Sequence, residues 1–180
     1  MSEINHLIIQ TEKGADDAPF FRIAEMEDAP AILEIYNEAV RTRCSCGHTS
    51  PITLISVIDW LEASYNKRPM WVIEVSRKII GWFSIQDFYG LPAFSSAVEV
   101  GIYISPSAQN QGLASKSLIF LEAFVRRIDV SHIVACIYRH NLNSICLFEK
   151  NNYEQWGCLP NIASIDGNRH DLLLLGKQLF

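Results

Sequence analysis

The fold is decided by the stretch VEVGIYISPSAQNQGLA, residues 98–114. Its first seven residues alternate apolar and other side chains, which predicts a strand over Ser96–Ile104 with Glu99 and Tyr103 on the face opposite the valines and isoleucines. An apolar stripe at helical spacing then predicts a helix over Gly112–Ile128, and His132–Ile137 reads as the next strand. A strand, helix and strand in this order require a parallel crossover.

The elements on either side of this unit complete an α/β protein with a mixed sheet. Asp28 is positioned as an N-cap, with Pro30 in the first turn of its helix. We predict helices over 28–40, 54–66 and 142–150, an antiparallel hairpin of 70–75 with 79–88, and further strands at 20–24, 153–158 and 171–175.

Composition limits the class of protein. The 180 residues are 49% hydrophobic and 19% charged, with a net charge of −5. The chain therefore has no basic field for nucleic acid, and it has no apolar run of the roughly 18 residues that a membrane span needs. We expect a flexible leader over 1–18, one domain over 19–180, and a cytoplasmic protein.

The cysteines favour reduced thiols over a disulfide framework. There are five, an odd number, and two lie in stretches predicted as buried strand or helix. Cys44, Cys46 and His48 crowd together, but a structural zinc site needs a fourth ligand. We expect no metal.

The segment Gln109–Ala114 lies between a strand and a helix, where successive backbone N–H groups can point at an anion. Gly112 and the small Ala114 permit close approach of a pyrophosphate. Plain turn chemistry is the alternative, because glycine is common at such turns.

These motifs carry a family resemblance. Gln109-x-x-Gly112-x-Ala114, with its preceding strand and following helix, resembles the acetyl-CoA motif Q/R-x-x-G-x-G/A of GNAT acetyltransferases. The segments 141–144 and 147–153 resemble the family's second cofactor segment. The segments 28–40 and 166–171, together with Val98-Glu99, resemble the phosphinothricin acetyltransferase branch, and the similarity covers about 20–176.

The resemblance implies the GNAT fold, a mixed, mostly antiparallel sheet with helices on both faces and a central pair of parallel strands that splay apart. It implies acetyl-CoA as co-substrate. Strand backbone groups at Ile102, Tyr103 and Ile104 would hold the pantetheine arm, to which Asn141 would bond. The pyrophosphate would lie on Asn110, Gln111, Gly112, Leu113, Ala114 and Ser115.

Amide formation from a thioester needs a neutral amine and hence a base, for which Glu99 is the candidate. The alternative for Glu99 is a solvated or ion-paired strand residue. Many family members protonate the leaving thiolate with a Tyr where this chain has Phe148, so the general acid is open, with Tyr103 and His170 as weaker candidates. No covalent acetyl-enzyme is needed, and we expect none of the cysteines to be placed to form one.

The resemblance implies a small amino-acid-like acceptor of the phosphinothricin, methionine sulfone or methionine sulfoximine type, and a homodimer. We expect the acceptor near 88–94, within an aromatic set of Trp82, Phe83, Phe88, Tyr89 and Phe94, although strand aromatics are usually core. Arg41 and Arg43 could pair with its carboxylate or simply be solvated. The rival functions are acetylation of a protein N-terminus or lysine, and a non-catalytic acyl-CoA sensor.

Overall fold

A computed structural model describes residues 18–44, 47–64 and 67–180. Its strands form one seven-stranded sheet in the order β1-β2-β3-β4-β5-β7-β6. Every neighbouring pair is antiparallel except β4 and β5. The strands are β1 Phe20–Ile23, β2 Met70–Val75, β3 Lys78–Asp87, β4 Ala97–Ile104, β5 His132–Tyr138, β6 Glu154–Ile165 and β7 Asn168–Gln178. The predicted mixed sheet with one parallel crossover is confirmed; residues 1–17 of the predicted leader lie outside the described residues.

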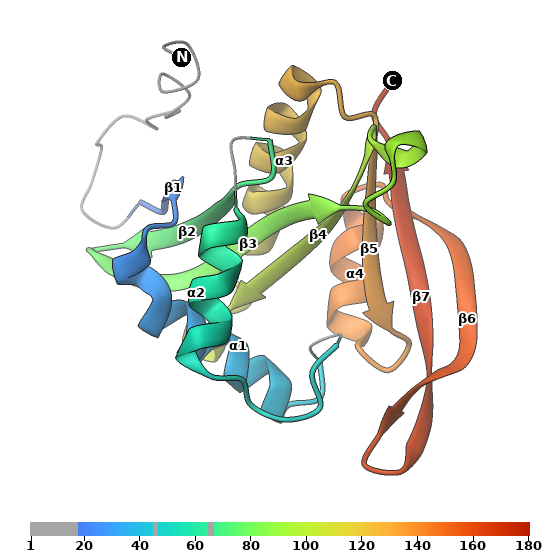
Figure 1. The fold of residues 1–180 in the computed structure, drawn as a ribbon, viewed down its shortest axis with the longest axis horizontal. Helices are drawn as coiled ribbons and strands as arrows, with labels where there is room; N and C mark the ends of the chain where they lie inside the picture. The colour runs from blue at the N-terminus through green and yellow to red at the C-terminus, as the bar shows by residue number, and fades with distance from the viewer. Residues whose placement is uncertain (1–17, 45–46, 65–66) are drawn as a thin grey trace.

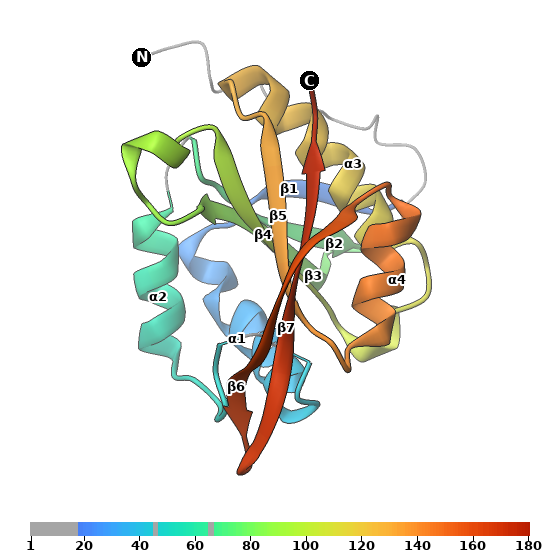
Figure 2. The same ribbon diagram turned by 90° about the vertical axis from the view of Figure 1, so that its right-hand side faces the viewer.

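Helices cover both faces of the sheet, as predicted (Figures 1 and 2). The helices α1 Ala29–Arg41 and α2 Leu54–Ala63 enclose one core with the sheet, and α3 Leu113–Val125 and α4 Leu142–Lys150 enclose the other. The alternation of β3 shows the division, because Trp82 belongs to the first core and Phe83 to the second. The sheet therefore separates two apolar layers.

The start of α1 differs from the prediction in one detail. Asp28 stands at the N-cap position, but its carboxylate does not cap α1. It accepts two hydrogen bonds from the Arg22 guanidinium, at 2.6 and 2.8 Å, and a third from the Glu25 backbone N–H. Burial of the carboxyl opposes ionisation, yet these donors together hold the pKa of Asp28 below its ordinary value. Asp28 thus fastens β1 to the helix.

The C-terminal strands are much longer than predicted. β6 and β7 form a ribbon that turns at Asp166 and Gly167, whereas the sequence indicated only 153–158 and 171–175. Register shifts between Gln155 and Gly157 and between Leu159 and Ala163 interrupt the alternation of β6, so the pattern there is weak. α2 also differs, because it ends at Ala63.

The parallel pair stays together over only three residues of each strand. Ala97, Val98 and Glu99 pair with His132, Ile133 and Val134, and beyond Glu99 the two strands diverge (Figure 1). A crossover through α3 places the N-terminus of that helix beyond the free end of β4. The divergence opens the sheet at its centre.

Candidate active site

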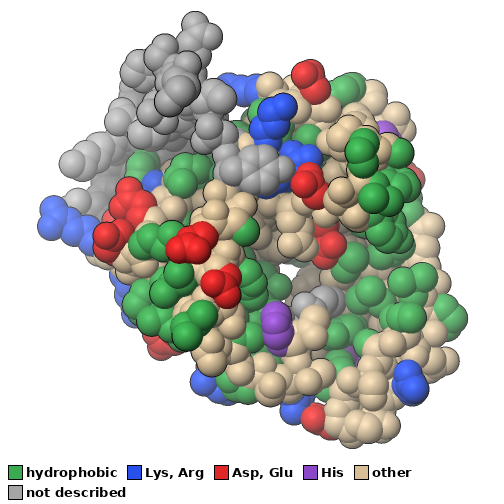
Figure 3. Space-filling model, in the orientation of Figure 1, with side chains coloured by type: hydrophobic (Ala, Val, Ile, Leu, Met, Phe, Trp, Pro, Cys, Tyr) green, Lys and Arg blue, Asp and Glu red, His purple; other side chains and the backbone are tan. Residues whose placement is uncertain are grey.

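A cavity of about 510 Å³ occupies the gap between β4 and β5. Its lining includes Val100, Ala135 and Phe148 from the core under α3 and α4, and Tyr36 and Trp82 from the core under α1 and α2. The cavity thus connects the two faces of the sheet, and the space-filling view shows the molecule hollowed near its centre (Figure 3). Its volume is in the range of small-molecule sites.

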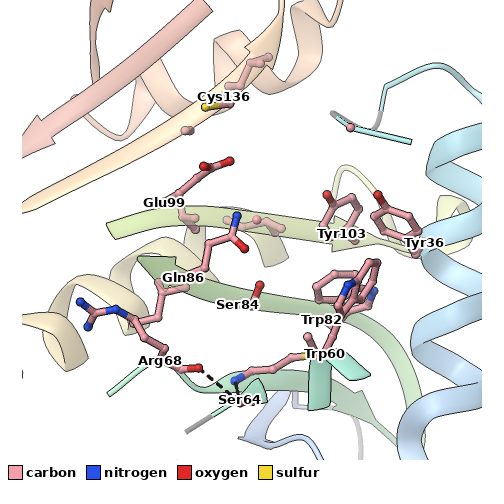
Figure 4. A pocket seen from close by; sticks show the side chains of 18 of the residues that line it. Tyr36, Trp60, Ser64, Arg68, Trp82, Ser84, Gln86, Glu99, Tyr103 and Cys136 are labelled. Carbon is pink, nitrogen blue, oxygen red and sulfur yellow. Dashed lines mark hydrogen bonds between the residues drawn. The ribbon is translucent and has the colours of Figure 1, made fainter. Parts of the chain in front are cut away.

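Glu99 lies at the point where the strands separate. It is the last residue of β4 that pairs with β5, and its side chain lines the cavity. In Figure 4 its carboxylate lies between β4 and β5, on the side of Cys136. The predicted base is thus placed at the opening through the sheet.

Side chains of β3 and β4 form one side of the cavity, which we call its floor, and they change from polar to aromatic along the strands. Three cross-strand pairs of β3 and β4 line it in succession: Gln86 with Glu99, Ser84 with Gly101, and Trp82 with Tyr103. Side chains at alternate positions share a face, so the three pairs follow one another along the floor. One end carries an amide and a carboxylate, and the other carries stacked rings (Figure 4).

Four residues at the second end form what we call the aromatic wall: Tyr36, Trp60, Trp82 and Tyr103. Trp82 stacks on Tyr103 with ring centroids 4.4 Å apart, and Tyr36 meets Trp60 and Tyr103 edge to face at 5.0 and 5.1 Å. The Tyr36 hydroxyl also hydrogen-bonds Nδ1 of the exposed His48 at 2.6 Å. Of these four, the sequence indicated Trp82 alone as a wall residue. Tyr36 and Trp60 come from α1 and α2, and the predictions for Tyr103 on β4 concerned a backbone contact and a possible acid role.

Arg68 is a second functional candidate that the sequence did not indicate. It lines the cavity before β2, and it is the one Lys or Arg among the described lining residues. Its Nε donates to Asp87 at 2.6 Å, and its two terminal nitrogens donate to the backbone oxygens of Lys67 and Ser95. These bonds use three of the five N–H groups of a guanidinium. Arg68 is 9% exposed.

The free edge of β4 offers backbone groups to a ligand. The Phe88 N–H bonds the Ala97 oxygen and the Ser105 N–H bonds the Ile80 oxygen, so alternate residues of β4 direct their backbone groups to β3. By this alternation Tyr103 faces β3 with its backbone, whereas Ile102 and Ile104 face the gap. The Ile104 oxygen is already bonded by the Gln109 side chain at 3.2 Å. Of the three predicted pantetheine contacts, Ile102 and Ile104 have backbone groups at the gap.

The predicted phosphate loop has the geometry of an anion cradle. Asn110 and Gly112 adopt left-handed φ values of 62° and 74°, and no side chain caps α3. A Cβ added to Gly112 would have nothing within 4 Å, so the loop is open to a bulky group. Gln111 is exposed, and Leu113 is buried, so Leu113 can offer only its backbone. Ala114 and Ser115 follow in the first turn, where the N–H groups lack partners in the helix. A pyrophosphate fits these residues.

The second cofactor segment is placed at the start and middle of α4. Asn141 caps this helix, since its Oδ1 accepts from the Ser144 N–H at 3.2 Å while its Nδ2 donates to the Cys44 oxygen. Phe148 is buried, lines the cavity and meets Tyr153 edge to face. Phe148, which stands where many GNAT family members have a Tyr, therefore lines the cavity but has no proton to donate to a leaving thiolate.

Several predicted contacts lie elsewhere. Arg41 pairs with Glu38, and Arg43 pairs with Asp166 in the turn between β6 and β7, so neither lines the cavity. His170 packs against His140, also away from it.

The substrate loop also differs from the expectation. Phe83 is fully buried in the core. Phe88, Tyr89 and Phe94 pack on one another, and Phe88 and Phe94 line a separate hollow of about 190 Å³. Cys44 and Cys136 line the cavity, so the prediction of direct transfer without an acetyl-cysteine needs an experimental test.

The four described cysteines form no disulfide with one another, and Cys46 lies outside the described residues. No group of three or more His, Cys, Asp or Glu in the described part of the chain is arranged to hold a metal ion. No helix within the described ranges is long and apolar enough to cross a membrane.

Comparison with known proteins agrees with this geometry. Residues 20–154 match the model of the acetyltransferase (GNAT) domain. The Bacillus subtilis protein YwnH, provisionally named a phosphinothricin acetyltransferase, is 34% identical over 88% of this chain and 98% of its own. The L-methionine sulfoximine/L-methionine sulfone acetyltransferase of Salmonella typhimurium is 29% identical over 88% of this chain and 93% of its own.

A solved structure shares the architecture. It is a provisionally assigned acetyltransferase of Salmonella typhimurium with its cofactor acetyl-CoA, and it superposes with a TM-score of 0.82 at 28% identity, over 91% of this chain and 95% of that one. The domain match covers well over half of the sequence. The chain therefore belongs to the GNAT acetyltransferase family.

Proposed function

We propose that the protein transfers the acetyl group of acetyl-CoA directly to the primary amine of a small amino-acid-like molecule, of the phosphinothricin, methionine sulfone or methionine sulfoximine type. The observation that carries this proposal is the position of Glu99, at the opening through the sheet and in a cavity of about 510 Å³. A cavity of that size suits a small molecule better than a polypeptide.

Each lining group has a role in this reaction. Glu99 takes a proton from the acceptor ammonium, and the freed nitrogen attacks the acetyl carbonyl carbon. The carbon–sulfur bond then breaks, and the attacking nitrogen loses its second proton to water. Backbone N–H groups at the free edge of β4 can stabilise the charge that develops on the carbonyl oxygen. The leaving thiolate takes a proton from water, because a thiol with a pKa near ~8.5 leaves without a dedicated acid. Phe148 is compatible with this route.

Other described residues would bind the pyrophosphate of acetyl-CoA and the carboxylate of the acceptor. Acetyl-CoA supplies the activated acetyl group, and the N-terminus of α3 from Asn110 to Ser115 would hold its pyrophosphate. Arg68 has two N–H groups left for the acceptor's α-carboxylate after its bonds to Asp87, Lys67 and Ser95.

The test is thiol release from acetyl-CoA with methionine sulfone, methionine sulfoximine, phosphinothricin and short peptides as acceptors. We expect turnover on at least one amino acid. Turnover on peptides alone would instead support protein acetylation, and acetyl-CoA binding without turnover would support a sensor. Cys136→Ala is the control for direct transfer, since a route through an acetyl-cysteine would lose activity in this variant.

We also propose a homodimer in the cytoplasm. The edge strand β6 exposes Trp156, Leu159 and Ile162, which are candidates for a contact between subunits. Light scattering at several protein concentrations would measure the oligomeric state.

A further inference from the structure

We propose that the acceptor carries an uncharged, apolar or aromatic side chain that packs against the aromatic wall, and that the site discriminates against an anionic side chain such as the phosphinate of phosphinothricin. This inference rests on the proposed function and narrows its substrate class. It follows from the order of groups along the cavity and from their charges.

The distance along the floor fits an amino-acid side chain. Glu99 and Gly101 are two residues apart on β4 and share a face of the sheet, so about 7 Å separates them at roughly 3.3 Å per residue. Tyr103 leans back over Gly101, because a Cβ built on Gly101 would lie 3.3 Å from its Cε2 and 3.9 Å from its hydroxyl. An acceptor with its nitrogen at Glu99 therefore reaches the wall with a side chain about five atoms long.

The wall presents ring surface that a ligand can cover. Trp60 and Tyr103 are partly exposed and line the cavity, whereas Trp82 is buried beneath them. Covering this surface with carbon atoms stabilises a complex by roughly 25 cal/mol per Å² of apolar surface removed from water. Aromatic faces carry partial negative charge, so they favour apolar or cationic groups over anions.

The charges of the lining oppose a second anionic group on the acceptor. Arg68 contributes +1, and Asp87 and Glu99 contribute −2, so the Lys, Arg, Asp and Glu side chains among the described lining residues sum to −1. Arg68 already bonds Asp87, and the acceptor's α-carboxylate takes its remaining N–H groups. Among the described residues, a phosphinate would therefore find no second Lys or Arg in the cavity lining to pair with.

The experiment compares kcat/KM for L-methionine sulfone, L-phenylalanine and L-phosphinothricin at pH 8. We expect kcat/KM for the two acceptors with uncharged side chains to exceed kcat/KM for phosphinothricin at least tenfold. Equal or better use of phosphinothricin would overturn the inference and leave the proposed function standing. If no amine is acetylated, the proposed function fails. Calorimetric Kd values for methionine sulfone and phosphinothricin then test the inference, and a Kd for phosphinothricin less than tenfold weaker would overturn it.

The aromatic wall is tested with Trp60→Ala and with Ile55→Ala as a matched control, since Ile55 is exposed on the same helix, α2, and lies outside the cavity. We expect Trp60→Ala to lower kcat/KM for phenylalanine at least tenfold and Ile55→Ala to leave it within twofold. Trp60→Phe, which keeps a ring, should retain most of the activity and separates loss of the wall from loss of folding. Unchanged phenylalanine turnover in a folded Trp60→Ala enzyme would overturn the inference.

Discussion

Gly112→Ala should weaken acetyl-CoA binding far more than it weakens the fold. The residue has φ +74°, where an L-residue costs roughly 1–2 kcal/mol, offset by about 0.4–1 kcal/mol from a less flexible unfolded chain. The net loss of about 0.5–1 kcal/mol lowers Tm by roughly 1–4 °C at this chain length. The new Cβ would enter the open space of the cradle, and losing one hydrogen bond to a charged group costs about 1.5–3 kcal/mol, or roughly 10- to 150-fold in Kd.

Gly167→Ala provides the matched control. Gly167 has φ +80° and nothing within 4 Å of its added Cβ, but it lies in the turn between β6 and β7. Calorimetric Kd values for acetyl-CoA and melting curves with and without it measure both effects. Both variants should lose similar stability without ligand, and only Gly112→Ala should lose affinity. Wild-type affinity in Gly112→Ala would refute the assignment of the cradle.

Three further variants test other parts of the structure. Asp28→Asn should cost about 1–3 kcal/mol of unfolding free energy at pH 7, because Arg22 loses one of its two charged partners and keeps only Glu74. Since the folded pKa of Asp28 is depressed, its contribution is present above the unfolded pKa near ~3.9, so urea titrations should show the difference shrinking as pH falls below that value. Arg68→Lys keeps the charge but loses the three-way hydrogen bonding, and kinetics should show KM for the acceptor rising at least tenfold with kcat within threefold. Phe148→Tyr should leave kcat within roughly threefold if water protonates the thiolate, and a tenfold gain would contradict that route.

The sequence was sufficient for the elements that carry a regular pattern. β4, the loop at Gly112, α3 and β5 occur where predicted because alternation, a strand-ending Ser105-Pro106 and a helical stripe act locally. The same segment positions Glu99, since a parallel crossover must bring β5 beside β4. Local pattern was thus enough to place Glu99 where the two strands separate.

The acceptor side of the cavity was not predictable in the same way. Tyr36, Trp60 and Arg68 come from α1, α2 and the segment before β2, and only packing of these helices on the sheet brings them together. Apolar loop residues such as Phe88 resembled a substrate wall, but they pack on their own neighbours. Composition cannot distinguish a ring that faces a cavity from one that faces a loop.

The most direct test of the mechanism is kcat for thiol release in Glu99→Gln, with Glu154→Gln, an exposed strand glutamate outside the cavity, as control. The account predicts a loss of about 10²- to 10⁴-fold at pH 7.5 for Glu99→Gln with acetyl-CoA affinity unchanged, and no loss for Glu154→Gln. The deficit should shrink near pH 10, where the amine no longer needs a base. A Glu99→Gln enzyme within threefold of wild type at pH 7.5 would contradict the account.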